Sequence, residues 1–421
     1  MLEIKKVREE SEKIVESLKK RGIDASSLIE DLLSLDVKRR DVLSKLESKK
    51  HVLNSISKEI GDLFKSGKAE EAQAKKTESI SLKSEIKELE AGLSEFESKI
   101  QDQLYEIPNT PHPSVPSGNT EEDNEVVFEQ KFDFPGGLSP HWELADQYAL
   151  IDFETGVKLT GAGFPVYKGK GAKLQRALIN FFLDEAESAG FQEVQVPLLV
   201  NEESGKGTGQ LPDKEGQMYH TELDHLYLIP TAEVPITNIY RDVIVDASEL
   251  PIKNCGYTPC FRREAGSYGK HVRGLNRLHQ FDKVEIVQIT QPENSYQVLE
   301  DMLQHSRSLL EKLELPYRVL RLCGGDLGFT SALTYDLEVW SAGQGRWLEV
   351  SSVSNFETFQ ANRLKLRYRA EDGKPQLAHT LNGSALALPR IVAALLENNQ
   401  SEKGIAIPEV LSKYTGFNII N

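Results

Sequence analysis

Apolar side chains recur every three or four residues along most of the first hundred residues. One frame of this kind runs through Leu28, Leu32, Leu35, Arg39, Val42, Leu46, Lys49, Leu53, Ile56, Ile60 and Leu63. A second frame runs through Leu82, Ile86, Leu89, Leu93, Phe96 and Ile100. Spacings that alternate between four and three residues are typical of helices packed in a coiled coil, and only Arg39 and Lys49 interrupt the pattern.

A short glycine-containing turn, Phe64-Lys65-Ser66-Gly67-Lys68, separates the two frames. The pattern therefore predicts an antiparallel coiled-coil hairpin over about residues 27–103, with limbs roughly 50–60 Å long. Basic residues cluster at 38–40, 49–50 and 75–76. They could follow a phosphate backbone, but exposed faces of any coiled coil look similar, and most coiled coils are spacers or oligomerisation elements. The pattern alone leaves the role of the hairpin open.

The pattern changes beyond the hairpin. Residues 107–123 contain four prolines and no helical periodicity, which indicates a linker. Farther on, the sequence predicts a helix at 171–190 and strands at 193–200, 225–229, 283–289 and 346–350. Strands joined by short turns favour an α+β fold, built on a mainly antiparallel sheet with flanking helices. We therefore predict three parts, which are an N-terminal helical domain at 1–104, a linker at 105–140 and a larger domain at 141–421.

Composition and charge narrow the choice of function. The formal net charge is −15, from 50 Lys and Arg against 65 Asp and Glu, and the whole acidic excess lies beyond residue 100. An acidic body argues against general nucleic-acid binding. No apolar run reaches the roughly 18–20 residues of a membrane-spanning helix, and the charged start lacks the apolar stretch of a signal peptide. We therefore expect a cytoplasmic protein with no membrane partner.

Two common kinds of site find no support in the sequence. The three cysteines, Cys255, Cys260 and Cys323, lack the C-x₂-C spacing of a structural zinc site and are too few for a disulfide framework. The glycine-rich segments 168–173 and 324–328 match neither the P-loop pattern nor the dinucleotide-binding pattern. We expect reduced thiols and no nucleotide site of either kind.

Three other segments carry residue types suited to a charged ligand. Arg262 and Glu264 lie in a strand-like stretch that leads into a mobile turn and a returning strand. Two residues apart on a strand, they would face the same side and offer a cation and an anion to one ligand. Arg390 lies where an apolar helix begins. The segment 348–355 ends a strand with one carboxylate and three hydroxyls, which suits a Mg²⁺ bound mostly through substrate phosphates.

With these segments in view, the chain resembles the seryl-tRNA synthetases of the bacterial type, a family of class II aminoacyl-tRNA synthetases. The resemblance extends over essentially the whole chain and rests on separated motifs. They are the opening M-L-x-I-K-x-x-R-E, the hairpin, I-P-N-x-P-H-x-S-V-P at 107–116, the class II dimer-interface motif near 190–197, G-T-G-Q-L-P at 207–212, P-T-A-E-V-P at 230–235, F-R-x-E at 261–264, and G-S-A-L-A with P-R at 383–390.

The resemblance implies a class II catalytic domain, for adenylation and dimerisation, over residues 141–421 and a tRNA-binding arm in the hairpin. It implies a serine–tRNA ligase, in which L-serine attacks the α-phosphate of ATP to give seryl-adenylate. The 3′ end of tRNA(Ser) then accepts the seryl group. Mg²⁺ would accompany ATP, and a homodimer would be the working form. Whether tRNA(Sec) is also charged stays open.

Individual residue roles also follow from the resemblance. Arg262 would hold the α-phosphate and stabilise the charge developing on it, with Arg390 as the second catalytic residue. In the ATP site, Glu264 would meet the adenine end, Phe281 would stack on the base, and Arg277 and Arg390 would bind the terminal phosphates. Glu349 and Ser352 would also bind Mg²⁺. The full set of expected ATP-binding residues is Arg262, Arg263, Glu264, Arg277, Leu278, Phe281, Glu349, Val350, Ser351, Ser352 and Arg390. Serine would be bound by Thr231, Ala232, Glu233, Glu285 and Ser384. A site that hydrogen-bonds the serine hydroxyl rejects alanine, because its buried polar groups would be left unpaired.

The chain departs from the usual family pattern at Leu333, Val353 and Asn362, and in the loop 267–273 with its Tyr268 and His271. Three other functions compete with the ligase. A class II synthetase of a different amino-acid specificity is disfavoured by the hairpin and by T-A-E with its companion glutamate. A synthetase-like enzyme that loads an amino acid onto a carrier protein would keep the adenylation residues but lack the hairpin. A purely structural coiled-coil protein would need none of those residues, and serine-dependent ATP–pyrophosphate exchange separates it from the enzymes.

Overall fold

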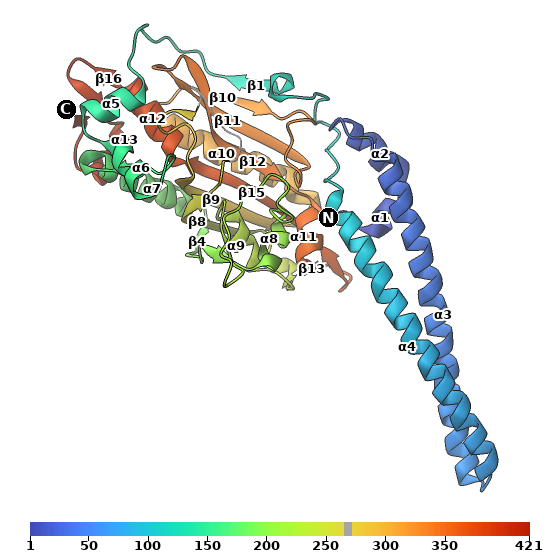
Figure 1. The fold of residues 1–421 in the computed structure, drawn as a ribbon. Helices are drawn as coiled ribbons and strands as arrows, with labels where there is room; N and C mark the ends of the chain where they lie inside the picture. Colours follow the sequence, from blue (N-terminus) through green and yellow to red (C-terminus); the bar gives the residue numbers. More distant parts are fainter. Residues whose placement is uncertain (265–271) are drawn as a thin grey trace. The chain divides into compact units, whose positions relative to one another are not determined.

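The computed structural model describes residues 1–264 and 272–421. These residues fall into two units that pack separately (Figure 1). One unit contains residues 2–19 and 23–108 and is entirely helical. The other contains residue 1, residues 20–22 and residues 109–421.

The helical unit consists of α1 (Ile4–Glu9), α2 (Ser11–Lys19), α3 (Ser26–Lys65) and α4 (Ala69–Glu106). The long helices α3 and α4 pack side by side and are joined by a turn at 66–68 (Figure 1). Gly67 has a φ of 76° there, a conformation that glycine adopts without steric cost. Every position of the two heptad frames is buried or half-buried, so the predicted hairpin is confirmed.

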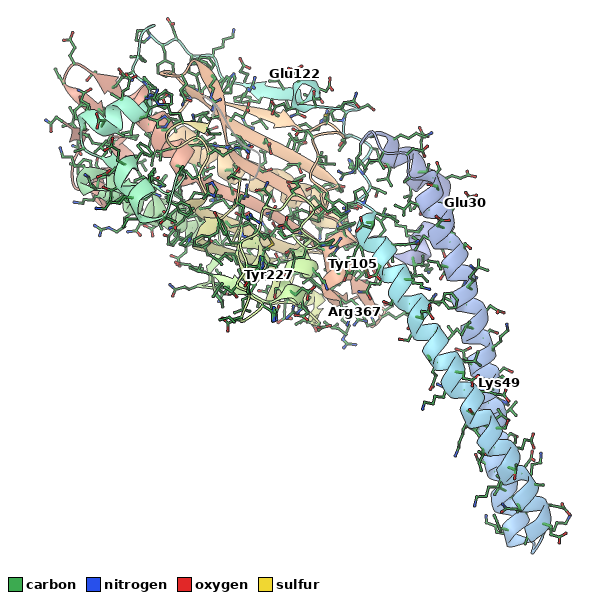
Figure 2. All side chains as sticks on the ribbon, in the orientation of Figure 1. Glu30, Lys49, Tyr105, Glu122, Tyr227 and Arg367 are labelled. Carbon is green, nitrogen blue, oxygen red and sulfur yellow. The ribbon has the colours of Figure 1, made fainter. Side chains whose placement is uncertain are left out.

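Ion pairs explain the two charged residues that interrupt the first frame. Arg39 donates to Asp36, 2.9 Å away, and the Asp36 carboxylate is fully buried. Lys49, labelled in Figure 2, pairs with Glu85 of the opposite helix. Two further pairs, Lys50–Glu90 at 2.7 Å and Lys75–Glu59 at 3.2 Å, also join α3 to α4. Basic residues in all three sequence clusters therefore have acidic partners within the hairpin itself.

The second unit is built on an eight-stranded sheet in the order β1-β10-β11-β12-β15-β9-β8-β4. The strands are β1 (Glu125–Glu129), β10 (Tyr317–Arg321), β11 (Leu333–Ser341), β12 (Arg346–Asn355), β15 (His379–Ala387), β9 (Gln280–Thr290), β8 (Ile252–Phe261) and β4 (Gln192–Glu193). All neighbours are antiparallel except β4 and β8, so the predicted antiparallel sheet is confirmed.

Helices cover the sheet and close its main core. The helices α7 (Gly169–Ser188), α10 (Ser295–Lys312) and α12 (Leu388–Asn398) pack against the central strands (Figure 1). Leu174, Phe181, Leu299 and Leu395 on these helices are fully buried. The apolar periodicity of the sequence thus produces a sheet with one helix-covered face, as expected for an α+β fold.

Smaller elements surround this framework. They are the helices α5 (His141–Gln147), α6 (Phe153–Leu159), α8 (Glu202–Thr208), α9 (Glu233–Asn238), α11 (Thr358–Leu364) and α13 (Glu409–Thr415), and the strands β2 (Ile151–Asp152), β3 (Val166–Tyr167), β5 (Leu199–Val200), β6 (Tyr227–Leu228), β7 (Ile244–Asp246), β13 (Arg367–Arg369), β14 (Pro375–Leu377), β16 (Gln400–Ser401), β17 (Gly404–Ala406) and β18 (Ile419–Ile420). The predicted strand at 193–200 is wrong as a single element, since β4 and β5 occupy only its ends. Pro197 lies between them and has no amide hydrogen for a sheet.

The cysteines and the helix lengths bear on two further expectations. The three cysteines are buried as free thiols. In the described part of the chain, no helix combines the length and the apolar content needed to cross a bilayer.

Asp36 allows a test of how the helical unit is held together. Burial would raise the pKa of the Asp36 carboxyl, but hydrogen bonds from Arg8 and Arg39 outweigh it and lower the pKa. Asp36→Ala leaves both guanidinium groups without their shared acceptor, so we expect the unfolding free energy of this unit to fall by about 1–3 kcal/mol. Urea unfolding followed by far-ultraviolet circular dichroism measures the change.

Asp41→Ala is the matched control. Asp41 lies on the same helix and pairs with Lys45 at 2.6 Å, but both side chains are exposed. Its removal should change the unfolding free energy by no more than about 0.5 kcal/mol. Equal losses in the two variants would contradict a special role for the buried carboxylate.

Candidate active site

The central strands bring two of the predicted serine-binding residues together. Glu285 of β9 lies directly opposite Ser384 of β15 in the strand register. Residues opposite one another on antiparallel strands point to the same face of the sheet. Glu285 and Ser384 are both buried, although they lie about a hundred positions apart in the sequence.

The Glu285 carboxylate is completely buried among polar partners. Asn382 Nδ2 donates to Glu285 Oε1 at 3.0 Å, and Lys283 Nζ lies 2.6 Å from Glu285 Oε2. Burial raises the pKa of Glu285, whereas the Lys283 ammonium and a hydrogen bond from the Thr231 hydroxyl oppose the rise. Asn382 therefore supplies a donor to one oxygen of this carboxylate, and the Lys283 ammonium lies beside the other.

Sequence reasoning missed Lys283 and Asn382. Each lies two residues before an expected site residue on the same strand, Lys283 before Glu285 and Asn382 before Ser384. Alternate residues of a strand share a face, so the spacing of two was an available signal. For Lys283 this signal was sufficient, whereas the role of Asn382 depends on knowing that β15 and β9 are neighbours.

A second buried carboxylate, Glu233, lies at the start of α9. The helix follows Ala232, and the Thr231 hydroxyl accepts a hydrogen bond from the Glu233 amide at 3.3 Å. Burial raises the pKa of Glu233 to about 7, the Gln360 hydrogen bond opposes the rise, and the nearby Glu285 carboxylate adds to it. The pKa of both carboxylates is raised, and the charge of Arg262 opposes the rise only weakly.

Gln360 of α11 orients Glu233 and was also missed from the sequence. Its Nε2 donates to Glu233 Oε1 at 2.6 Å and to the Thr208 carbonyl at 3.1 Å. Its Oε1 accepts from the Thr380 hydroxyl at 2.8 Å. With both ends of the amide engaged, the donor that faces Glu233 cannot turn away without losing the other bonds.

Arg262 lies just beyond the end of β8. Its guanidinium lies over the Phe281 ring, 5.3 Å from the centroid, and Nε donates to the Pro230 carbonyl at 3.4 Å. The Arg262 amide donates to the His279 carbonyl at 2.9 Å, which extends the pairing between the two strands by one bond. A cation is thus fixed between the Pro230 segment and the returning strand.

The prediction that Arg262 and Glu264 share a strand face is wrong. The strand β8 ends at Phe261, and the Glu264 backbone has a φ of 49°. The chain turns away because the Glu264 amide bonds Gln217 Oε1 at 3.1 Å, so the alternation of a strand no longer applies. Glu264 instead pairs with Arg277 at 3.0 Å. The expected mobile turn, with Tyr268 and His271, lies outside the described residues except for its end.

Four further residues of the predicted site line one cavity of about 1020 Å³. Arg277, Arg390, Glu349 and Ser352 all contribute to its wall, together with Asp336. The Ser352 hydroxyl donates to Asp336 Oδ1 at 2.6 Å. Arg390 Nη1 donates to the Glu349 carbonyl at 2.6 Å. Burial, together with the Glu349 carboxylate, raises the pKa of Asp336.

Several expected ATP-binding residues point their side chains elsewhere. The side chains of Leu278, Val350 and Ser351 are buried, and the Ser351 hydroxyl donates to the Ser384 carbonyl at 2.6 Å. Leu278 and Val350 pack in the main core, and none of the three residues lines the cavity that contains Arg277 and Arg390. Arg263 is exposed.

The three residues that depart from the family pattern have their side chains in packing or hydrogen-bonding contacts within the protein. Leu333 and Val353 are buried in the main core. The Asn362 side chain donates to the Met1 carbonyl at 2.9 Å.

Comparisons with known proteins agree over the whole chain. Residues 1–111 match the Seryl-tRNA synthetase N-terminal domain, and residues 218–399 match the tRNA synthetase class II core domain (G, H, P, S and T). A serine–tRNA ligase of Salinibacter ruber is 54% identical over 423 residues, which cover 99% of this chain and 98% of that protein. Another, of Prosthecochloris aestuarii, is 46% identical and covers 100% of this chain and 99% of that protein.

A solved structure agrees with the sequence relatives. The crystal structure of seryl-tRNA synthetase from Pyrococcus horikoshii complexed with ATP superposes with a TM-score of 0.92 at 37% identity, over 100% of this chain and 99% of that one. The chain therefore belongs to the seryl-tRNA synthetase family of class II aminoacyl-tRNA synthetases.

Proposed function

We propose that this chain activates L-serine with ATP to form seryl-adenylate and pyrophosphate, and then transfers the seryl group to the 3′ end of tRNA(Ser). One observation carries the proposal beyond the similarity to serine–tRNA ligases. Two buried carboxylates, Glu233 and Glu285, both contact Thr231, and the Arg262 guanidinium donates to the carbonyl of the preceding residue, Pro230. This pocket offers anions to an amino group and a cation to a phosphate.

Serine recognition follows from the polar lining of that pocket. Glu233 and Glu285, with Thr231, would bind the ammonium and hydroxyl groups of serine, and Ser384 would add a hydroxyl contact. Ala232 would contribute through its backbone. Alanine would leave buried acceptors unpaired, an effect worth about 10⁴–10⁵ in discrimination in favourable cases. The larger side chain of threonine would be excluded by the size of the pocket.

Activation requires positioning more than proton transfer. The serine carboxylate oxygen forms a bond to the α-phosphorus, the bond to the bridging oxygen breaks, and the electron pair leaves with pyrophosphate. The nucleophile is already ionised at neutral pH, so no general base is needed. Arg262 would stabilise the charge that develops on the α-phosphate, because a planar guanidinium keeps its charge and binds two oxygens at once.

The other expected residues would hold the rest of ATP. Phe281 would stack on adenine, and Glu264 would meet the adenine end. Arg277 and Arg390 would bind the terminal phosphates. Because Glu264 and Arg277 pair with each other at 3.0 Å, the proposal requires that this ion pair opens when Arg277 takes a phosphate.

The residues near Ser352 fit a Mg²⁺ that is bound with ATP. Among the described residues, no group of three or more histidine, cysteine, aspartate or glutamate side chains could hold a metal ion alone. Glu349 and Ser352 line the same cavity. The Ser352 hydroxyl donates its hydrogen bond to Asp336, so the lone pairs of its oxygen can coordinate a cation. Mg²⁺ usually takes one or two protein oxygens and completes its shell with phosphates and water. It would neutralise phosphate charge.

We extend the proposal to the two units and their partners. The hairpin of α3 and α4 would bind tRNA(Ser), and the ion pairs within it favour recognition by shape and backbone over a strong basic patch. The domain limits 1–104, 105–140 and 141–421 are part of this proposal. A homodimer would form through the segment at 190–197, and β4 at the edge of the sheet supports this. The reaction would take place in the cytoplasm, and charging of tRNA(Sec) stays open.

Serine-dependent ATP–pyrophosphate exchange tests the reaction itself. Run with each of the twenty amino acids, it should give exchange with serine far above any other. Arg262→Ala should slow this exchange by about two to three orders of magnitude with the fold intact, because the α-phosphate loses its fixed cation. Unchanged exchange in Arg262→Ala would remove that residue from the site, and exchange with another amino acid would replace serine.

The raised pKa of Glu233 predicts a pH dependence. The free enzyme needs this carboxylate ionised to pair with the serine ammonium, and its pKa is about 7. As the pH falls through that value the carboxyl gains a proton, so kcat/KM for serine should fall about tenfold per pH unit below it. Gln360→Leu removes the hydrogen bond that lowers the pKa, so the whole profile should move to higher pH. Identical profiles in the two proteins would contradict this assignment.

Deletion of about residues 27–103 separates the proposed roles of the two units. The shortened chain should keep serine-dependent exchange, because every proposed serine and ATP residue lies beyond residue 230. Aminoacylation of tRNA(Ser) should be lost, because the proposed tRNA contacts lie in the hairpin. Exchange serves as the internal control for folding. Normal charging by the shortened chain would show that the hairpin is not needed to bind tRNA.

A further inference from the structure

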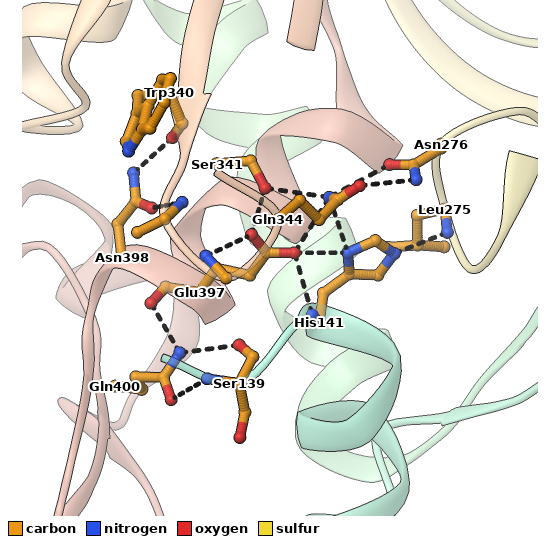
Figure 3. Close-up of polar contacts among 12 residues, drawn as sticks. Ser139, His141, Leu275, Asn276, Trp340, Ser341, Gln344, Glu397, Asn398 and Gln400 are labelled. Atoms are coloured by element: carbon orange, nitrogen blue, oxygen red, sulfur yellow. Dashed lines mark hydrogen bonds and ion pairs between the residues drawn. The ribbon is translucent and has the colours of Figure 1, made fainter. Parts of the chain in front are cut away.

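A buried polar network lies at the C-terminal end of α12, away from the groups assigned to serine. At its centre is Glu397, which is fully buried (Figure 3). Its Oε1 accepts from the His141 amide at 2.9 Å and from Gln344 Nε2 at 3.1 Å. Its Oε2 accepts from the Gly343 amide at 3.0 Å and from the Ser341 hydroxyl. Burial would raise the pKa of Glu397, but bonds from His141 and Ser341 outweigh it and lower the pKa.

His141 links this carboxylate to the loop that leads to Arg277. His141 Nε2 accepts from the Leu275 amide at 2.8 Å, so the ring proton resides on Nδ1, 2.7 Å from Glu397 Oε1. The loop approaches closely because Gly274 has no side chain. A Cβ there would lie 2.2 Å from His141 Nε2.

Gln344 makes a second link to the same loop. Asn276 Nδ2 donates to Gln344 Oε1 at 2.8 Å, while Gln344 Nε2 contacts Asn276 Oδ1 at 3.3 Å (Figure 3). The Asn276 carbonyl in turn accepts from Arg390 Nε at 3.1 Å. The contacts form a closed ring, since Arg390 lies in the first turn of α12 and Glu397 in its last turn. Arg277, the next residue after Asn276, lines the same cavity as Arg390.

We propose that the network of Glu397, His141 and Gln344 positions Arg277 and Arg390 for the terminal phosphates of ATP. The inference rests on the proposed function, which assigns those two arginines to the phosphates. The network residues are positioning residues, because none is placed against the substrate. They hold Leu275 and Asn276, and these hold the two arginines at a set separation.

The network is built from a buried carboxylate and hydrogen-bonding side chains, which is not what structural support of a core requires. Burying an ionised carboxylate is costly, and well-packed apolar residues often stabilise a core as well or better. Hydrogen-bonding groups add direction, since each donor has a defined acceptor. That direction is useful where a loop must present a cation at one place.

Gln344→Ala tests the proposal in the full chain. It removes both bonds to Asn276 and leaves Glu397 with His141, Ser341 and Gly343. We expect the Kd for ATP to rise about fivefold to tenfold, the change expected from losing one or two hydrogen bonds. AMP lacks the terminal phosphates, so its Kd should stay within about twofold, and the KM for serine should not change. Isothermal titration with ATP and with AMP measures the split, and thermal unfolding records stability.

Gln400→Ala is the matched control within the same cluster. Gln400 Nε2 donates to the carbonyls of Ser139 and Glu397, both at 2.8 Å, and its Oε1 accepts from the Ser139 amide at 3.0 Å. It makes no recorded bond to residues 272–278. We expect a comparable loss of thermal stability with the ratio of ATP to AMP affinity unchanged.

The possible results distinguish the positioning role of the network from the phosphate-binding role of Arg390. If Gln344→Ala weakens ATP and AMP equally, or if Gln400→Ala changes the ratio as much, the network only supports the fold and the proposal is overturned. Arg390→Ala should weaken ATP but not AMP, and if it does while Gln344→Ala does not, the positioning role alone fails. If Arg390→Ala leaves ATP binding intact, the proposed phosphate contact fails instead. Should Gln344→Ala not fold, Gln344→Met keeps the side-chain volume, breaks the same link and carries the same expectation.

Discussion

The cost of burying negative charge governs the centre of this molecule. Glu233 and Glu285 lie in the interior, where an ionised carboxylate is stable only with donors or a cation beside it. Lys283 meets this need for Glu285 at 2.6 Å, whereas Glu233 has the neutral amide of Gln360. The pocket is thus left with one anion whose charge is incompletely compensated. A ligand with an ammonium group would supply the missing charge, which gives a physical reason for an amino acid as substrate.

The register of neighbouring strands brings the other site residues together. Three neighbouring strands, β12, β15 and β9, carry Ser352, Ser384 and Glu285. The helix α12 follows β15 directly and presents Arg390 in its first turn. Residues that are distant in sequence therefore meet because the antiparallel sheet holds their strands in a fixed alignment.

Local patterns predicted the local parts of this structure well. The heptad frames identified the hairpin because burial in a coiled coil depends on spacing alone, and the predicted strands at 283–289 and 346–350 lie inside β9 and β12. The shared face of Arg262 and Glu264 failed because Gln217, nearly fifty residues away, draws the chain out of the strand. Asn382 and Gln360 were missed because their partners are set by tertiary contacts. The site residues came from the family resemblance, and their roles remain proposals.

The length of α12 has a consequence for how this protein can change. Arg390 and Glu397 are seven residues apart, which is about two helical turns and roughly 10 Å along the axis. They consequently emerge from nearly the same side of the helix. Inserting or deleting one residue between them would rotate one end by about 100° relative to the other. Positions 391–396 are buried in the core and accept only apolar side chains of similar volume, and a change in their number would disturb both ends of the helix at once.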